Sequence, residues 1–386
     1  MDGKKKAFAS VLLAFFVMGF VDMVGTATNY VKADFALSDT VANFLPSMVF
    51  FWFFFLSVPT SLLMGRIGKR KTVMLSLAVT ALAMLPPMLS YRYGLMLVSF
   101  ALLGIGNTLM QVSLNPLVGL LVSGDKLASR LTFGQFVKAI ASFITPLLTG
   151  WMAVSLGDWK IIYPSFMAVS VLSLVVMWRT ELDEGLGTDD KPRSSFRQCL
   201  SLLGDGTILL LFFGIVSHVG IDVGVNTCVP KIIMERTGSP LEKATMATSV
   251  YFLFRTVGAL SGTFILSRMD LRKFFAISAV MIVLAVAGLF AGHSLWAIYL
   301  AAALVGYGNS NVFSMILSTA LLARPDKGDE VSGLMIMGLI GGAIFPLLMG
   351  ILSDALGSQV GSVLVISIGA AYLVYVAFWF FKRKAA

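Results

Sequence analysis

The chain has 386 residues, of which 58% are hydrophobic and only 13% are charged. A soluble domain carries about 25% charged residues, so this composition excludes an ordinary soluble fold and indicates a protein surrounded by lipid. The two cysteines, Cys199 and Cys228, are too few for a disulfide framework or a cysteine-rich metal site.

Apolar runs follow one another along the whole chain, and each is close to the ~20 residues needed to cross a hydrocarbon core. Twelve spans are predicted, at residues 8–31, 41–64, 72–91, 94–122, 130–154, 161–178, 206–230, 244–267, 274–292, 295–322, 331–353 and 360–381. The short basic start, Met1 to Lys6, precedes a run long enough to remain as a helix rather than act as a cleaved signal. The sequence therefore predicts an all-α polytopic membrane protein.

The net charge of +9 is typical of a nucleic-acid partner, but its distribution excludes one. With the N-terminus inside, the inner loops and tails hold 21 Lys and Arg residues, whereas the outer loops hold six: Lys32, Arg92, Lys160, Lys231, Arg236 and Lys243. Short cytoplasmic loops collect positive charge. We therefore expect a multi-pass protein of the plasma membrane, the inner membrane of a bacterium, with both termini cytoplasmic.

One stretch between the sixth and seventh spans is polar enough to be a connector. Thr180 to Arg197 is acidic and then basic, with Gly, Pro and Ser, as in flexible linkers. It divides the chain into an N-terminal six-helix bundle (1–179), a cytoplasmic linker (180–205) and a C-terminal six-helix bundle (206–386).

The two halves repeat each other at an offset of about 200 residues. FITPLLTG at Phe143–Gly150 returns as AIFPLLMG at Ala343–Gly350, and LGIGN at Leu103–Asn107 returns as VGYGN at Val305–Asn309. Asp22 in the first span falls on Asp222 in the seventh. Two parallel six-helix repeats resemble the major facilitator fold, in which the solute site lies between the halves near the midplane.

Three segments carry a closer resemblance. VSGLMIMGLIGGAIFPLLMGILSD at Val331–Asp354, Asn115-Pro116, and RLTFGQ at Arg130–Gln135 are similar to the fucose–glucose/galactose–proton symporter family. The resemblance implies a major facilitator fold of 12 transmembrane helices in two pseudo-symmetric bundles. It also implies import of a monosaccharide by alternating access, coupled to protons.

The sequence departs from that family at positions that matter for its mechanism. The acidic residues that serve coupling and sugar binding in helices 1 and 4 of the fucose symporter align with Thr26 and Gln111 here. A sugar-binding amide of helix 5 is replaced by Lys138, while Gln135 one turn earlier matches. Proton coupling must therefore use other groups.

Five charged or titratable residues lie deep in the spans: Asp22, Lys138, His218, Asp222 and Arg255. Such residues are expensive in a membrane, at least ~2.5 kcal/mol for a charge on insertion scales, and they usually face a cavity and a partner. All five lie on helices that line the cavity in the resembling fold. We expect the pairs Asp22–Lys138 and Asp222–Arg255. Each pair is either a substrate or proton site, or an ion pair that only holds its own half together.

Neutral polar residues in the same helices complete the predicted site, because amides and hydroxyls both donate to and accept from a hydroxylated solute. The predicted substrate-binding residues are Asp22, Thr26, Gln111, Gln135, Lys138, Asn226, Arg255 and Asn309, and the candidates for proton coupling are Asp22, Asp222 and His218. His218 and Asp222 are one helical turn apart, which favours a relay. Asn107 and Asn309 beside their glycines fit close helix packing equally well. Gly341-Gly342, Pro346 and Pro146 mark points where helices 11 and 5 can bend.

The sequence thus predicts a secondary active transporter that imports a monosaccharide or similar polar solute. Transport of an organic anion or sugar acid through Lys138 and Arg255, and uncoupled facilitated diffusion, are the alternatives. With only His218 and His293, and no metal-ligand spacing or phosphate-binding motif, we expect no enzyme activity, no metal and no cofactor. The driving force would be the proton gradient. The expected partners are a small polar solute and the lipid bilayer but no nucleic acid, and the expected state is a monomer.

Overall fold

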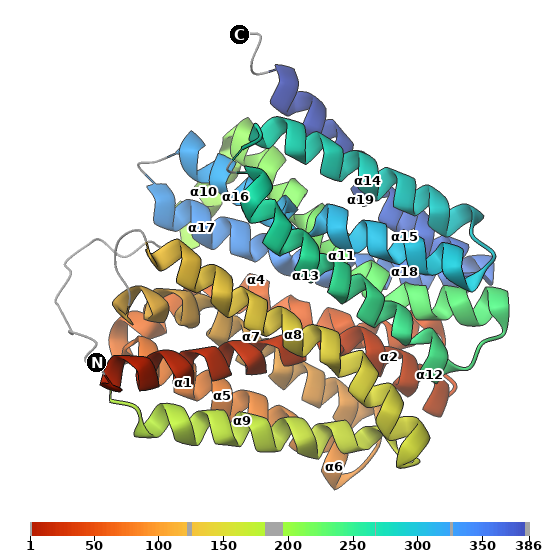
Figure 1. Ribbon diagram of the computed structural model, residues 1–386, viewed down its shortest axis with the longest axis horizontal. Coiled ribbons are helices and arrows are strands. Elements are labelled where there is room, and N and C mark those ends of the chain that lie inside the picture. Colours follow the sequence, from red (N-terminus) through yellow and green to blue (C-terminus); the bar gives the residue numbers. More distant parts are fainter. Residues whose placement is uncertain (1, 122–125, 182–195, 267, 325–326, 383–386) are drawn as a thin grey trace. The chain divides into compact units, whose positions relative to one another are not determined.

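The computed structural model describes residues 2–121, 126–181, 196–266, 268–324 and 327–382. Within these ranges the chain is helical and contains no strand (Figure 1). Twelve spans are long and apolar enough to cross a membrane: Lys6–Asp34, Asp39–Thr60, Lys69–Leu89, Tyr93–Leu114, Phe133–Ser155, Trp159–Arg179, Gly206–Thr237, Leu241–Leu266, Leu271–Ala291, Leu295–Ala320, Gly333–Leu356 and Val360–Phe380. Each overlaps one predicted span, so the predicted class, a multi-pass α-helical membrane protein, is confirmed.

The chain forms two compact units. The first comprises Met1–Met23 and Trp52–Ser195, and the second comprises Val24–Phe51 and Phe196–Ala386. Residues 24–51 therefore group with the C-terminal half of the sequence. The predicted division into 1–179 and 206–386 stays a prediction, and residues 182–195 of the predicted linker lie outside the described residues.

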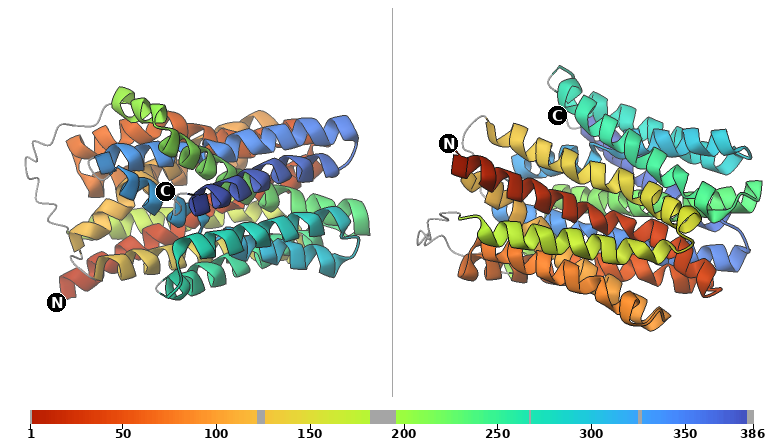
Figure 2. Two further views of the ribbon diagram at one scale, coloured as in Figure 1. Left: turned by 90° about the horizontal axis from the view of Figure 1, so that it is seen from above. Right: turned by 60° about the horizontal axis from the view of Figure 1, so that its bottom comes forward.

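The first unit contains α1 (Asp2–Met18), η1 (Gly19–Asp22), part of α4 (Phe44–Ile67), α5 (Lys69–Ala83), α6 (Leu85–Leu89), α7 (Tyr93–Leu121), α8 (Lys126–Ser155), η2 (Trp159–Ile161) and α9 (Ile162–Arg179). The helices α1, α5, α8 and α9 run alongside one another (Figures 1 and 2).

The second unit contains most of α2 (Met23–Asp34), α3 (Asp39–Ala42), the start of α4, α10 (Phe196–Ser201), η3 (Leu202–Gly204), α11 (Gly206–Thr237), α12 (Leu241–Ala244), α13 (Met246–Leu266), α14 (Leu271–Ala291), α15 (Leu295–Asn309), α16 (Val312–Ala323), α17 (Gly328–Met337), η5 (Gly338–Ile340), α18 (Gly341–Leu356) and α19 (Val360–Lys382). Helices α13, α14 and α15 lie side by side in Figure 1.

The packing inside the two units repeats as the sequence does. In the first unit, α1 packs against α7, α8 and α9, and α5 packs against α7 and α9. In the second unit, α11 packs against α15, α18 and α19, and α14 packs against α15 and α19. Each helix of the second set is the sequence repeat of its counterpart in the first. The predicted pair of six-helix repeats is therefore also a repeat of helix contacts.

Several spans are interrupted near their middle. The first passes through the 3₁₀ turn η1, which ends at Asp22, and the eleventh passes through η5 immediately before Gly341. A Cβ on Gly341 would collide with the Val216 carbonyl of α11, and one on Gly338 would lie 2.9 Å from the Ile215 side chain. The small residues of helix 11 thus both mark its irregular turn and allow close packing on α11. Helix α8 continues without interruption through Pro146.

Candidate functional site

Helix α11 carries a carboxylate in an otherwise apolar stretch, and two residues of α13 bind it. Arg255 Nη2 lies 3.1 Å from Asp222 Oδ2, and the Tyr251 hydroxyl donates to Asp222 Oδ1. Tyr251 and Arg255 are one helical turn apart and share a face of α13. The Arg255 and Asp222 side chains are 26% and 14% exposed, so the pair is not sealed in the core. The predicted Asp222–Arg255 pair is therefore present.

His218, one turn before Asp222, is bound by α15. The Asn309 amide donates from Nδ2 to the His218 carbonyl at 3.1 Å, and its Oδ1 lies 2.8 Å from His218 Nδ1. Because an amide oxygen only accepts, Nδ1 must carry a proton, which leaves Nε2 of a neutral ring as an acceptor. Among the described residues the His218 ring has a hydrogen bond to Asn309 and none to Asp222. The His218–Asp222 relay stays a prediction.

The first half contains the same asparagine bond without the histidine. Asn107 donates from Nδ2 to the Met18 carbonyl at 3.1 Å, which is the equivalent of the bond from Asn309 to residue 218. Cβ atoms built on Gly106 and Gly308 would likewise meet the carbonyls of Ser76 at 3.3 Å and Ser278 at 3.1 Å. The packing role of both asparagines is thus observed, and a contact of Asn309 with solute stays a prediction.

In the first unit, Asp22 lies against α8. The Ser142 hydroxyl is 2.5 Å from Asp22 Oδ2 and 3.1 Å from the Lys138 carbonyl. The turn η1 lies close to α8 here: a Cβ on Gly19 would lie 2.6 Å from that same carbonyl. Asp22 and Lys138 thus belong to one contact region of η1 and α8, as the predicted pairing requires. The ion pair itself stays a prediction.

The remaining predicted residues are distributed between the units. Gln111 on α7 and Gln135 on α8 belong to the first unit, and the Gln135 side chain is exposed. Thr26 and Asn226 are buried in the second unit. Asn226 packs on α2, because a Cβ on Gly25 would lie 2.5 Å from its Oδ1. The structure thus brings together Asp222, Arg255, His218 and Asn309, and separately places Thr26 near Asn226.

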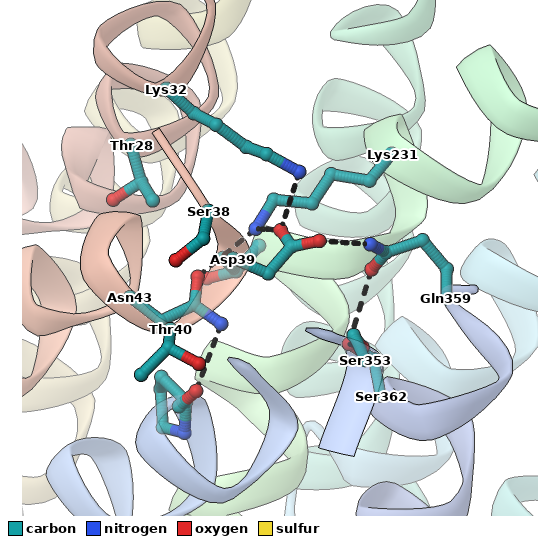
Figure 3. Close-up of polar contacts among 12 residues, drawn as sticks. Thr28, Lys32, Ser38, Asp39, Thr40, Asn43, Lys231, Ser353, Gln359 and Ser362 are labelled. Atoms are coloured by element: carbon teal, nitrogen blue, oxygen red, sulfur yellow. Dashed lines mark hydrogen bonds and ion pairs between the residues drawn. The ribbon is translucent and has the colours of Figure 1, made fainter. Parts of the chain in front are cut away.

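Sequence reasoning missed a second polar cluster, which we call the Asp39 network: Lys32, Asp39, Asn43, Lys231, Asp354 and Gln359. Figure 3 shows three side chains converging on the Asp39 carboxylate. Lys231 Nζ lies 2.7 Å and Lys32 Nζ 2.8 Å from Oδ1, and Gln359 Nε2 donates to Oδ2 at 2.7 Å. The predicted seventh span ends at residue 230 and leaves Lys231 in an outer loop, whereas α11 continues to Thr237.

The model of the Major Facilitator Superfamily matches residues 10–232 and 210–386 of the chain. The chain belongs to this superfamily. The two matched ranges overlap at residues 210–232, and together they cover nearly the whole sequence.

Named relatives and solved structures agree with this membership. The chain is 26% identical to a glucose/galactose transporter of Brucella abortus, over 96% of this chain and 92% of the relative. The E. coli fucose:proton symporter superposes with a TM-score of 0.71 at 19% identity, covering 98% of this chain and 99% of that one. A nucleoside transporter superposes with a TM-score of 0.78 at 13% identity, covering 98% and 99%. At these identities the solved structures establish the fold alone.

Superfamily membership makes this chain a transporter rather than an enzyme, as predicted. The Asp222–Arg255 pair then lies on helices 7 and 8, which line the cavity of the fold that the sequence resembles.

Proposed function

We propose that the chain imports a hexose such as glucose or galactose by alternating access, coupled to protons. The observation that carries the proposal is the cluster of Asp222, Arg255 and Tyr251, read beside relatives named glucose/galactose transporters. A carboxylate, a guanidinium and a phenol together offer acceptors and donors to the vicinal hydroxyls of a sugar ring.

The charge balance of this cluster favours a neutral sugar over a sugar acid. The Arg255 guanidinium is 3.1 Å from the Asp222 carboxylate, so a second carboxylate would have to compete with one already in place. Lys138, the other cation predicted for an anionic solute, lies on α8 in the first unit. We therefore keep the organic anion or sugar acid as the second candidate, with Lys138 as its contact.

We propose the proton gradient as the driving force, with no cofactor. Thr26 and Gln111 stand where acidic residues of the resembling family act, so Asp222 and Asp22 are the proposed proton carriers. The Asp222 carboxylate forms an ion pair with Arg255 and accepts a hydrogen bond from Tyr251, and the Asp22 carboxylate accepts one from Ser142. Uncoupled facilitated diffusion is the outcome if neither carboxylate takes up a proton.

The excess of Lys and Arg in alternate loops supports a location in a bacterial inner membrane with both termini cytoplasmic. It also supports the lipid bilayer, and not a nucleic acid, as the partner of these basic residues. We propose that the protein works as a monomer, with the halves 1–179 and 206–386 rocking about the solute site.

The test is uptake into proteoliposomes under an imposed pH gradient. Labelled glucose, galactose, fucose and galacturonate are offered to the wild type, to Asp222→Asn and to a control, Lys160→Gln, which opens an exposed ion pair with Asp158 at 3.4 Å. We expect an acidic exterior to drive accumulation of a neutral hexose. Accumulation should fall at least tenfold in Asp222→Asn and should be unchanged in Lys160→Gln.

Two other outcomes would change the proposed function. Uptake that ignores the pH gradient would remove proton coupling. Accumulation of galacturonate alone, lost in Lys138→Gln, would replace the sugar by a sugar acid.

A further inference from the structure

The start of the second span is bound to three helices of the C-terminal half through the Asp39 network. The Asp39 carboxylate accepts from Lys231 of α11 and from Gln359 at the start of α19. The backbone N–H groups of Asp39 and Thr40 donate to the Asp354 carboxylate of α18 at 2.8 and 2.7 Å. Asp39, Lys231 and Gln359 are all buried, so the two side-chain bonds to the Asp39 carboxylate are buried, whereas the Thr40 bond to Asp354 is exposed.

Hydrogen bonds extend this contact along one face of α18. Asn43 Nδ2 donates to the Pro346 carbonyl at 2.8 Å, and Ser47 Oγ donates to the Ala343 carbonyl at 2.7 Å. Lys231 Nζ also donates to Asn43 Oδ1 at 3.0 Å. The partners on α18 recur every three or four residues, as expected for one helix face.

Backbone packing is close at the centre of this face. An ideal Cβ on Gly350 would lie 2.7 Å from both the Asp39 carbonyl oxygen and the Thr40 Cα. Only glycine allows this approach, so the contact between α3 and α18 can be blocked by adding a side chain at position 350.

A pocket of about 650 Å³ opens beside the network and is lined by Lys32, Asp39, Lys231, Glu235, Asp354 and Gln359 among others. Its charged groups are bonded to other residues of the lining. Glu235, for example, accepts from the Ser358 hydroxyl at 2.6 Å and from the Gln359 N–H at 2.7 Å. Asn29, which also lines the pocket, keeps both amide atoms buried without a hydrogen-bond partner among the described residues.

Residues 38–51 belong to the first six-helix repeat, whereas α11, α18 and α19 belong to the second. An alternating-access carrier must separate its halves on one side of the membrane to admit solute. We propose that the Asp39 network is the latch of the outer gate, with Asp39 and Lys231 as the positioning residues that hold it shut. This inference rests on the proposed function, because the outer side is defined by the proposed orientation.

The same unit also buries polar atoms that have no hydrogen-bond partner. Among the described residues, Thr26 Oγ1, Ser249 Oγ and both amide atoms of Asn29 are buried without a hydrogen-bond partner. Helix α2, which carries Thr26 and Asn29, is part of the same first-repeat segment. Burying unpaired polar groups is unfavourable, so these atoms favour an open state that gives them water, while the latch favours closure. A gate balanced in this way responds to small changes in either set.

The test measures exposure of the latched face directly. Ser47→Cys places a thiol where a buried hydroxyl faces α18, in a background with Cys199→Ser and Cys228→Ala. Right-side-out vesicles are treated with a membrane-impermeant maleimide in the absence of sugar. We expect Asp39→Asn and Lys231→Gln each to raise the labelling rate at least tenfold.

Two further variants test the latch by other means. Gly350→Val blocks the approach of α3 without altering a charge, and it should raise labelling as much as Asp39→Asn does. Ser249→Ala removes an unpaired hydroxyl and should lower labelling below that of the parent. Arg324→Gln is the matched control, because it opens an ion pair with Asp205, the capping residue of α11, and this pair involves no residue of the first repeat.

A structural role alone would lower the yield of folded protein without changing the labelling rate of the folded fraction. A sugar-binding measurement distinguishes a purely structural role from a latch. Loss of a latch favours the outward-open state, which strengthens sugar binding from outside and lowers accumulation. Unchanged labelling in folded Asp39→Asn and Gly350→Val would overturn the latch. Labelling needs no sugar, so it is independent of whether the proposed substrate is transported.

Discussion

Asn107 and Asn309 each donate from Nδ2 to a main-chain carbonyl, that of Met18 or His218, at 3.1 Å. An amide at this place binds the fourth helix of each half to the first. The second half adds His218, whose Nδ1–H occupies the free amide oxygen. This asparagine thus joins two helices in both halves, and in the second half it also holds the His218 ring in place.

Replacing either asparagine by leucine tests that reading. Asn107→Leu should lower the free energy of unfolding by about 1 kcal/mol, in the range of membrane-helix hydrogen bonds. Asn309→Leu should lower it more, because the buried His218 Nδ1–H also loses its acceptor. Thermal unfolding in detergent would measure both. Equal losses would show that the histidine contact contributes nothing.

At the scale of the element, α11 has both ends defined by side chain and backbone chemistry. Asp205 Oδ1 caps its start by accepting from the Thr207 N–H at 2.8 Å and the Ile208 N–H at 3.4 Å. Gly238 ends it in the left-handed conformation, with φ of 62°. The helix therefore runs 32 residues, which is longer than its apolar run. That extra length is what places Lys231 in the Asp39 network.

The charge on Asp205 has a consequence for pH. Hydrogen bonds from the Arg324 guanidinium, at 2.9 and 2.5 Å, hold the pKa of the Asp205 carboxyl below its usual value, and the Thr207 and Ile208 N–H groups act in the same direction. A lowered pKa stabilises the folded state above the usual value of about 3.9 and ceases to do so as pH falls through the folded-state pKa.

Asp205→Asn should therefore be less stable than the wild type at pH 7 and at pH 5 by the same amount. The difference should shrink as pH falls from about 4 through the lower folded-state pKa, because the carboxyl of the unfolded wild type is protonated first and that of the folded wild type only afterwards. Asparagine is a good cap, so the variant isolates the charge from the helix start. Unfolding temperatures at several pH values measure the difference. A gap that persists unchanged at pH 3 would contradict the assignment.

Sequence patterns predict some of these features and miss others, for physical reasons. The pair Asp222–Arg255 was predictable, because charges inside long apolar runs need partners and both helices line the cavity of the resembling fold. Lys231 was not, because a lysine near the end of a span looks like the start of a loop. Asp39 lies more than 300 residues from Asp354 and Gln359 in the sequence, so no local pattern links them.

At the scale of the whole molecule, the repeat of sequence is also a repeat of packing, with α1 and α11 at equivalent positions among their neighbours. The exception is the stretch Val24–Phe51, which groups with Phe196–Ala386. The first repeat thus contributes a segment to the compact unit that contains the second. The repeat was predictable from the sequence. The grouping of residues 24–51 with the second repeat was not, because it depends on contacts such as those of Asp39.

Expression of the chain as two fragments, 1–188 and 189–386, tests what that segment contributes. The fragments should co-purify from detergent and restore transport together, because the cut falls in the polar linker. Asp39→Asn in the first fragment leaves Lys231 buried in the second with one fewer charge partner. Breaking a buried pair in this way costs about 3–5 kcal/mol, so co-purification should fall by about a hundredfold or more in affinity. Combining Asp39→Asn with Lys231→Gln removes the uncompensated charge and should recover part of the loss. The control Lys160→Gln should change nothing, and full co-purification of Asp39→Asn would mean that the segment 24–51 holds its partners by apolar contact instead.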